Sequence, residues 1–189
     1  KTIACVPKEI PVIADAKRGD IGSTAEAYAS AIFDYYRCDG VTLNPLLGKD
    51  SLQPFLNRRD RGLFILCLTS NPGAKDFEMP DKLYLKIARK IQEWNEAGNC
   101  GLVTGATHPE YLKEIRALAP DLPLLIPGVG AQGGSIEEVA PIAGDSRGCG
   151  YIINVSRAIS EPKGGGEFTS LVAAAAIDYK NAINRAKEA

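Results

Sequence analysis

The sequence contains a single histidine, His108, and no Cys-x-x-Cys pair. Zinc sites need clustered histidine and cysteine ligands, so this composition argues against a bound metal. Five cysteines are scattered along the chain: Cys5, Cys38, Cys67, Cys100 and Cys149. An odd number of widely spaced cysteines is typical of reduced thiols in a cytosolic setting. His108 lies beside an expected helix start, where we expect a structural or solvated side chain rather than a catalytic one.

The chain also lacks a strong net charge and any long hydrophobic run. Its formal net charge of −1 provides no basic field for binding nucleic acid. No apolar stretch approaches the length of a membrane span, and residues 1–7 do not have the pattern of a signal peptide. We therefore expect a cytoplasmic protein that binds neither nucleic acid nor membrane. The 189 residues suffice for one domain with a sizeable core.

Six short apolar segments are predicted to be β-strands: residues 10–14, 41–43, 63–68, 102–104, 124–126 and 151–155. Their apolar residues are continuous rather than alternating, which is typical of parallel strands covered on both faces. Between the strands, apolar residues recur at helical spacing, and a last helix is expected after the glycines at 164–166. The repeated order of strand, loop and helix predicts a parallel sheet built from βα units.

Three helix starts carry a capping-box pattern. The patterns are Ser23-x-x-Glu26, Thr107-x-x-Glu110 and Ser135-x-x-Glu138. Each predicts that a hydroxyl oxygen accepts a hydrogen bond from the backbone N–H three residues later. Pro109 falls near the first position of its helix, where a missing N–H costs least.

Two parallel architectures are compatible with six βα units. A doubly wound sheet can close on six strands, whereas a (β/α)₈ barrel needs eight. Residues 2–8 resemble the end of a helix, so a barrel would lack its first two βα units in this chain. Those units would need roughly 60 residues, since eight units take about 250. Both architectures place an active site at the C-terminal ends of the strands.

The first predicted strand ends in Asp-Ala-Lys-Arg-Gly-Asp-Ile, residues 15–21. Buried strands do not normally end in four charges within six residues. Residues two apart in a strand share a face, so Asp15 and Lys17 are expected to point the same way, and Asp20 follows after the chain has turned. A site that holds one charge, repels another and delivers a proton needs such a dense arrangement. The alternative is a solvated strand end with an ordinary Asp–Lys pair.

Glycines dominate the loop after the fifth predicted strand. Gly128, Gly130 and Gly133 let backbone N–H groups approach an anion, and Gln132 adds a long neutral donor. Arg157, at the end of the neighbouring strand, offers a planar charge that suits phosphate. We predict a phosphate site here, although a mobile turn beside an exposed arginine is the alternative. The spacing fits neither a dinucleotide-binding motif nor a P-loop.

Polar residues also end two other predicted strands. Asn44 follows the second strand, and Ser70, within Thr-Ser-Asn-Pro-Gly at 69–73, follows the third. Each either faces a ligand or caps a turn. Residues 75–78 form either a flexible flap or an ordinary surface loop.

Four motifs occur in one order along the chain. They are residues 15–21, residues 69–73, Pro-Gly-Val-Gly-Ala-Gln-Gly at 127–133 and Ser-Arg-Ala-Ile at 156–159. Together they resemble the orotidine 5′-phosphate decarboxylase family, and Lys-Arg-Gly-Asp-Ile resembles its longer, second-type branch. That branch includes free-standing bacterial enzymes and decarboxylase domains fused to orotate phosphoribosyltransferase.

The resemblance implies a (β/α)₈ barrel of which this chain shows strands three to eight. It also implies a homodimer with active sites shared at the interface. The family carries an alternating Lys–Asp–Lys–Asp array, in which Asp15 matches the first aspartate and Lys17 the second lysine. Asp20 matches the last aspartate, and Thr24 matches a further residue. The family supplies both of these to the partner's site.

The remaining matches concern the substrate. Ser70 matches a residue that contacts the pyrimidine, and Gln132 and Arg157 match a pair that grips the phosphate. The family's first array lysine and a ribose-binding aspartate come from strands one and two. This chain contains no counterpart of either.

The activity implied by the resemblance is decarboxylation of orotidine 5′-monophosphate to UMP and CO₂, the last step of de novo pyrimidine synthesis. It uses no cofactor, and Lys17 would protonate C6 of the ring. Two alternatives stay open. One is a metal-dependent sugar-phosphate lyase of the same superfamily, and the other is a non-catalytic domain that binds a nucleotide or phosphate.

Overall fold

The computed structural model describes residues 2–130 and 132–188, and within them it forms one parallel sheet of six strands. The strands are β1 (Ile13–Arg18), β2 (Gly40–Leu43), β3 (Gly62–Leu68), β4 (Cys100–Thr104), β5 (Leu124–Ile126) and β6 (Tyr151–Ile153). Each strand pairs in parallel with the next, so their order in the sheet is their order in the chain. The parallel βα repeat predicted from the apolar segments is therefore confirmed.

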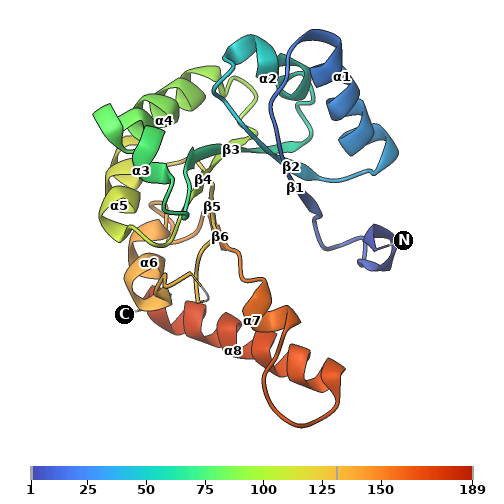
Figure 1. Cartoon of the computed structure of the whole chain (residues 1–189), viewed down its shortest axis with the longest axis vertical. Coiled ribbons are helices and arrows are strands. Elements are labelled where there is room, and N and C mark those ends of the chain that lie inside the picture. Colours follow the sequence, from blue (N-terminus) through green and yellow to red (C-terminus); the bar gives the residue numbers. More distant parts are fainter. Residues whose placement is uncertain (1, 131, 189) are drawn as a thin grey trace.

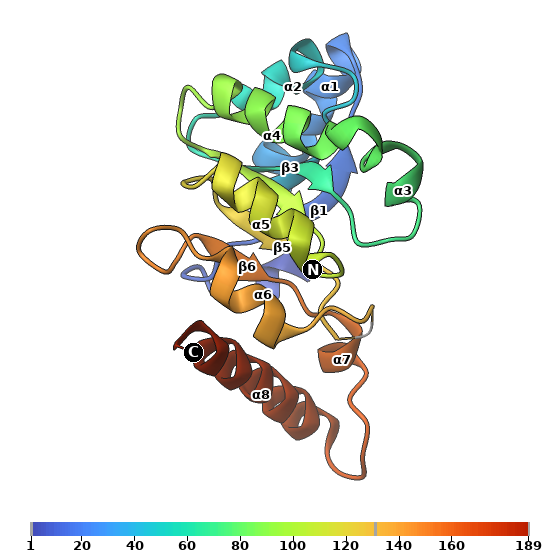
Figure 2. The same cartoon turned by 90° about the vertical axis from the view of Figure 1, so that its left-hand side faces the viewer.

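Helices follow the strands and cover the outer face of the curved sheet (Figure 1). The longer ones are α1 (Gly22–Ser30), α2 (Lys49–Leu56), α4 (Leu83–Trp94), α5 (Pro109–Leu118), α6 (Ile136–Ala143) and α8 (Phe168–Glu188). Short helices are α3 (Ala74–Phe77), α7 (Arg157–Ser160) and the single turns Ile3–Cys5 and Pro80–Lys82, and a π-turn, Ala31–Tyr35, extends α1. Figure 2 shows α4, α5, α6 and α8 stacked in sequence along this outer layer.

Sequential strand order with helices on one face is the pattern of a (β/α) barrel, not of a doubly wound sheet. A doubly wound sheet reverses its strand order and carries helices on both faces. Here the sheet curves into a half-barrel, and the longer helices α1, α2, α4, α5 and α6 lie on its convex face (Figure 1). Of the two architectures that the sequence allowed, the structure therefore selects the barrel type. Within the described residues β1 and β6 each pair with one neighbour, so both are sheet edges.

The main core lies between the outer face of the sheet and the helices. Its largest fully buried side chains include Leu43, Leu63, Ile65, Leu68, Leu102, Leu124, Phe55, Tyr84, Ile91, Leu112 and Ile115. Because successive strand residues point to opposite faces, their neighbours form a second, smaller cluster on the concave side. Phe64, Val103 and Leu125 are buried there, with Ile13 and Leu66 packed against them. Most of these concave-side residues also line the floor of the candidate site.

The first strand differs from its predicted limits. It begins at Ile13 rather than at residue 10 and continues through the charged residues to Arg18. Pro11 has no N–H to give to a ladder, and the N–H of Val12 donates to the side chain of Asp39 at 2.8 Å. The strand continues past its apolar part because Arg18 pairs again with Leu43 after an irregularity. The sixth strand is shorter than predicted and ends at Ile153.

Of the three capping boxes, one is confirmed. Ser135 Oγ accepts a hydrogen bond from the Glu138 N–H at 3.3 Å at the start of α6. The box at Ser23 is wrong because α1 begins at Gly22, which places Ser23 inside the helix rather than at its N-cap. The box at Thr107 is wrong because His108 occupies the N-cap position of α5. Pro109 is the first residue of that helix, as predicted.

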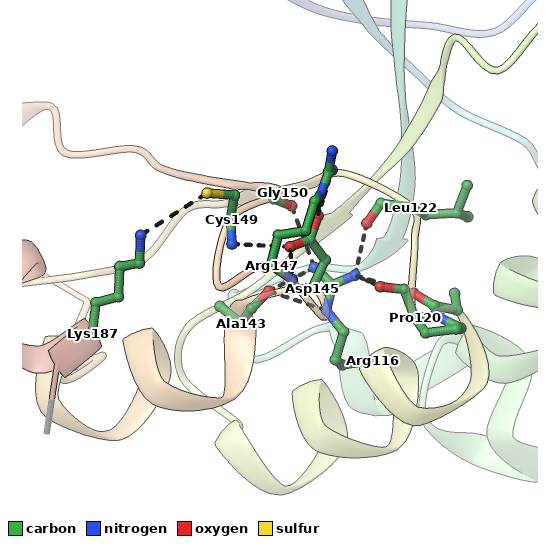
Figure 3. A network of polar contacts seen from close by, with 10 residues as sticks. Arg116, Pro120, Leu122, Ala143, Asp145, Arg147, Cys149, Gly150 and Lys187 are labelled. Carbon is green, nitrogen blue, oxygen red and sulfur yellow. Dashed lines mark hydrogen bonds and ion pairs between the residues drawn. The ribbon is translucent and has the colours of Figure 1, made fainter.

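A buried arginine, Arg116, ties together the elements at the N-terminal ends of β5 and β6, the end of these strands opposite the candidate site (Figure 3). Arg116 is 9% exposed, and burial lowers the pKa of its guanidinium. The guanidinium donates to backbone carbonyls of Ala119, Pro120, Leu122, Ala143 and Gly150. Two of these carbonyls end α5 and α6, where the helix dipole is negative, and the others flank β5 and β6. Arg116 thereby fixes the two strands whose opposite ends carry the glycine loop and Arg157.

The loop before β6 is held by a second set of contacts beside Arg116 (Figure 3). Arg147 donates to Asp145 Oδ2 at 2.6 Å, and the Cys149 N–H donates to Asp145 Oδ1 at 3.0 Å. These hydrogen bonds lower the pKa of Asp145 to about 2, so the carboxylate stays ionised at any ordinary pH. Lys187 Nζ lies 3.9 Å from Cys149 Sγ and brings the end of α8 to the same loop.

Two expectations from the composition concerned the cysteines, expected to be reduced thiols, and the absence of membrane-spanning segments. In the described part of the chain, Cys38, Cys67 and Cys100 are buried thiols and Cys149 is an exposed thiol. Burial raises the pKa of the Cys100 thiol to about 11 and that of Cys67 further still. None of the helices in the described ranges combines the length and the apolar character needed to cross a membrane.

Candidate active site

A cavity of about 610 Å³ opens at the C-terminal ends of the strands, on the concave side of the sheet. Its walls come from the ends of β1, β3, β5 and β6, which are the four places that the sequence singled out. Its lining includes Asp15, Lys17, Thr69, Ser70, Asn71, Gly128, Gln132, Asn154 and Arg157. Its apolar floor is made by Ile13, Leu66, Val103, Leu125 and Ile152. Charged and polar groups therefore stand above an apolar floor, where water screens the charges less than in bulk.

Asp15 and Lys17 form an ion pair at the end of β1, as their spacing predicted. Lys17 Nζ lies 2.6 Å from Asp15 Oδ1 and 2.7 Å from Oδ2, and both side chains are about half exposed, at 56% and 51%. Partial burial raises the pKa of Asp15, but hydrogen bonds from Lys17 and Thr42 outweigh it and hold that pKa below its usual value. At neutral pH the cavity therefore contains a fixed carboxylate beside an ammonium group.

The backbone is irregular at this pair. Lys17 has a φ of +46°, in the left-handed region that residues with a Cβ rarely adopt. The pairing of β1 with β2 shifts register between Ala14 and Arg18, so the pair sits on a bulge. Bulges beside active sites aim particular side chains, and this one brings Lys17 Nζ against both oxygens of Asp15.

Ser70 and Gln132 meet in the middle of the cavity. Ser70 Oγ donates to Gln132 Oε1 at 2.5 Å and joins the loop after β3 to the loop after β5. Gly128 lies beneath them with a φ of +97°, and a Cβ there would come within 2.8 Å of Ser70 Cβ. Only glycine fits that position, because both its conformation and its contact exclude a side chain. The sequence assigned Ser70 and Gln132 to different ends of a ligand and did not foresee their contact.

The glycine loop is compact because it bonds to itself. The Gly133 N–H donates to the Gly130 carbonyl at 2.8 Å, and the Gly134 N–H donates to the Gly128 carbonyl at 3.0 Å. The Gly130 N–H donates to the Gly134 carbonyl at 3.1 Å. These amides are therefore engaged within the loop, and Gly130 and Gly133 do not line the cavity. Ala131 lies outside the described residues.

Arg157 is the cation at the far wall of the cavity from Lys17. It is the first residue of α7, directly after β6, and its side chain is exposed. Among the described residues it has no hydrogen-bond or ion-pair partner, so its guanidinium can accept an anion without breaking a contact. With Gln132 in the same lining, it forms a polar end suited to a phosphate.

Asp20 and Thr24 do not line this cavity. The Asp20 carboxylate accepts a hydrogen bond from the Ile21 N–H at 2.8 Å, and Thr24 is exposed on α1. Three large apolar side chains are exposed after β1 and β2: Ile21, Leu46 and Leu47. The ends of these two strands touch, because a Cβ on Gly19 would lie 3.0 Å from Asn44 Cβ. Asp20 and Thr24 thus stand on a surface that combines polar and apolar groups, outside their own chain's cavity.

Two other candidates, Asn44 and His108, have structural explanations. Asn44 Oδ1 accepts a hydrogen bond from the Leu46 N–H at 3.0 Å, which confirms the turn-capping alternative. His108 occupies the N-cap position of α5 without a side-chain capping bond, and its Nδ1 lies 3.5 Å from Glu110 and its ring against Tyr111, as expected for a structural residue. Within the described ranges, no group of three or more His, Cys, Asp or Glu residues is arranged to hold a metal ion.

Sequence reasoning missed two residues that shape the cavity. Thr42 on β2 bonds to both Asp15 and Lys17, and the signal in the sequence was a lone hydroxyl within an apolar strand. Glu78, in the segment that was expected to be a flap or a surface loop, accepts hydrogen bonds from the Thr69 N–H at 2.6 Å and from Thr69 Oγ1 at 2.9 Å. It fixes the strand end that presents Ser70. No local pattern identifies it, because its partner lies nine residues away across a loop.

The chain matches a known protein family over most of its length. Residues 2–166 match the family described as "Orotidine 5'-phosphate decarboxylase / HUMPS family". A protein named orotidine 5'-phosphate decarboxylase from Herpetosiphon aurantiacus is 51% identical over 97% of this chain, which spans 71% of that relative.

Solved structures agree with the sequence match. A Leishmania donovani OMP decarboxylase superposes with a TM-score of 0.89 at 40% identity, covering 99% of this chain and 72% of that one. A Leishmania donovani UMP synthase superposes with a TM-score of 0.87 at 42% identity, covering 98% of this chain and 41% of that one. At identities of 40% and 42%, these proteins share sequence with this chain as well as the fold.

Proposed function

Because this chain belongs to the orotidine 5′-phosphate decarboxylase family, we propose that it converts orotidine 5′-monophosphate to uridine 5′-monophosphate and CO₂. The observation that carries the proposal is one cavity shared by the Asp15–Lys17 pair and Arg157. The pair comes from β1 and Arg157 from the start of α7, after β6; β1 and β6 are the opposite edges of the sheet, so these groups stand at opposite sides of the chamber. A pyrimidine nucleotide with a carboxylate on its ring carries anionic groups at both ends. Its carboxylate would lie near Lys17 and its phosphate near Arg157.

Lys17 is the proton donor in this proposal. The bond between C6 and the carboxylate breaks, its electron pair remains on C6, and CO₂ leaves. The Lys17 ammonium stabilises the developing charge and transfers a proton from Nζ to C6, after which water restores the lysine proton. An ammonium held 2.6 Å from Asp15 is already in place before the substrate reacts, so little reorganisation is needed during the step.

Asp15 contributes by repulsion as well as by holding Lys17. Its anionic carboxylate would lie near the substrate carboxylate, whose charge is lost as CO₂ departs. Two unit charges ~4 Å apart repel by roughly 4 kcal/mol at an effective dielectric of about 20. That is a useful part of the barrier reduction but small beside the ~8–23 kcal/mol that enzymes supply in total. The remainder comes from electrostatic preorganisation and from phosphate binding remote from C6.

The same proposal includes a full eight-stranded barrel. Its support is that β1 and β6 are both open edges in the described chain and that Ile152, on the cavity floor, is 47% exposed. Two further strands between these edges would cover this floor. They would also carry the family's first array lysine and its ribose-binding aspartate.

Turnover of orotidine 5′-monophosphate by the native polypeptide tests the activity. We expect CO₂ release and the matching absorbance change, both unaffected by EDTA, and the intact mass of the same sample reports any residues beyond the 189 of this chain. UMP binding without CO₂ release would instead indicate a nucleotide-binding domain. Loss of turnover in EDTA would indicate a metal-dependent lyase.

We further propose that Asp20 and Thr24 serve the active site of a second subunit. Support comes from their position outside their own cavity and from the exposed Ile21, Leu46 and Leu47 beside them. Asp20 of one subunit would then hold Lys17 of the other charged and oriented. A two-fold symmetric dimer makes this arrangement reciprocal.

Mixed dimers give a sharp test of the shared site. In a heterodimer of Lys17→Ala and Asp20→Ala subunits, one site loses both groups and the other regains both. Equal mixing should therefore restore about a quarter of wild-type activity, because half of the dimers are mixed and each has one intact site. If Asp20 acts within its own chain, both sites of every dimer lack one group and no activity returns. Differently tagged subunits, quantified by native mass spectrometry, establish that mixing occurred.

A further inference from the structure

We propose that Thr42 is a positioning residue for decarboxylation: its hydroxyl holds the Asp15 carboxylate and the Lys17 backbone in the geometry that the reaction needs. This inference rests on the proposed function of the site. It concerns a residue of β2 that lines no part of the cavity itself and acts only through its two bonded neighbours.

The position of Thr42 makes its hydroxyl unusual. The residue is 1% exposed in a strand whose other residues, Gly40, Val41 and Leu43, are also buried. Val41 and Leu43 face the main core, so Thr42 faces the concave side, in register with Phe64 of β3. A buried hydroxyl costs free energy unless it is hydrogen-bonded. This hydroxyl is bonded in both of its capacities, as an acceptor and as a donor.

As an acceptor, the hydroxyl completes the bulge in β1. Four residue steps along β1, from Ala14 to Arg18, match two steps along β2, from Val41 to Leu43. The Lys17 N–H is thereby displaced from the regular ladder, and Thr42 Oγ1 accepts its hydrogen bond at 2.9 Å. The left-handed backbone of Lys17, at a φ of +46°, persists only where its surroundings hold it. The Thr42 hydroxyl is the side-chain group that does so.

As a donor, the same hydroxyl fixes the carboxylate. Thr42 Oγ1 donates to Asp15 Oδ1 at 2.8 Å, the oxygen that also receives Lys17 Nζ at 2.6 Å. When Lys17 Nζ gives its proton to C6, the lysine loses its charge and its ion pair with Asp15 is lost. Thr42 then remains as the fixed donor that keeps Asp15 in place. One hydroxyl therefore links the backbone that aims the proton donor to the carboxylate beside it.

The test compares two substitutions of Thr42. Thr42→Val keeps the shape and removes the hydroxyl, and we expect kcat to fall by roughly 10²-fold, the effect of a misplacement of about 1 Å, with KM and UMP affinity little changed. Thr42→Ser keeps the hydroxyl and should retain most of kcat. Thr42→Ala repeats the test if the valine variant does not fold.

Thr104 supplies a matched control. It is also a threonine buried in a strand, at 0% exposure, but its Oγ1 has no hydrogen-bond partner in the described part of the chain. Thr104→Val should therefore leave kcat unchanged. If both valine variants lost activity equally, the loss would reflect strand packing and the proposal would fail.

An Asp15→Ala background separates positioning from general damage. If Thr42 acts through Asp15, Thr42→Val should lower kcat much less in that background than in the wild-type chain. An equal loss in both backgrounds overturns the part of the inference that concerns Asp15, and a serine variant that is as impaired as the valine variant overturns the inference as a whole. Absence of turnover by the wild-type protein would instead contradict the proposed function.

Discussion

Replacing Lys17 with alanine is expected to abolish decarboxylation while nucleotide binding survives. Lys17 is the ammonium that the cavity presents beside Asp15, so its removal deletes both the proton donor and the charge that stabilises C6. A positioned general acid contributes typically 10²–10⁴-fold, and electrostatic stabilisation adds to it, so kcat should fall by roughly 10⁴-fold or more. UMP affinity should change little, because Ser70, Gln132 and Arg157 stand elsewhere in the cavity.

Single-turnover decarboxylation and UMP titration measure the two halves of this prediction separately. Lys86→Ala removes an exposed lysine from α4, on the outer layer, and is the matched control for loss of one positive charge. Turnover by the Lys17→Ala protein at the control rate would remove Lys17 from the role of proton donor. Loss of UMP binding together with activity would indicate that Lys17 supports the fold of the cavity rather than the chemistry.

Continuous apolar segments predicted the strands well, because a strand that is buried on both faces consists of consecutive apolar residues. Strands β2 to β5 lie within two residues of their predictions. The start of β1 was wrong because Pro11 and the side-chain bond to the Val12 N–H remove ladder contacts that hydropathy does not report. Capping boxes at Ser23 and Thr107 failed because the first helix begins two residues earlier, and the second helix one residue later, than the pattern requires.

Residues that act through tertiary contacts were not predictable in the same way. The sequence reveals Asp15, Lys17 and Arg157 because they are charged residues that follow apolar strand segments. Thr42 does not, because its role depends on a register shift between two strands that no sequence window contains. Glu78 likewise acquires its role only when its loop folds back onto Thr69.

The glycine loop lies beside the cavity, but its backbone amides are not arranged as the sequence led us to expect. The sequence placed an anion site there because glycine amides can approach a phosphate. In the structure the amides of Gly130, Gly133 and Gly134 bond to carbonyls of the same loop. Gly128 instead permits close contact with Ser70, which holds Gln132. If a phosphate binds at this wall, as we propose, we expect the Gln132 and Arg157 side chains to hold it rather than these amides.

Arg157→Ala is consequently the second substitution with a large expected effect. A guanidinium can give a phosphate two charge-assisted hydrogen bonds, each worth about 1.5–3 kcal/mol, so their loss should lower kcat/KM by roughly 10²–10⁴-fold. KM should rise, and kcat should also fall because phosphate binding helps to hold C6 against Lys17. Arg157→Lys should recover only part of the loss, since an ammonium keeps the charge but not the planar pair of donors.

Orotidine, which lacks the phosphate, isolates the interaction. Because its decarboxylation cannot use Arg157, the Arg157→Ala and wild-type proteins should process it at similar rates. Arg89→Ala, which removes an exposed arginine from α4, provides the control for loss of charge on the nucleotide substrate. Equal impairment of both substrates by Arg157→Ala would show that Arg157 supports the cavity as a whole. Unchanged kinetics on orotidine 5′-monophosphate would remove the phosphate from this wall, leaving the free guanidinium at the end of β6 without a ligand.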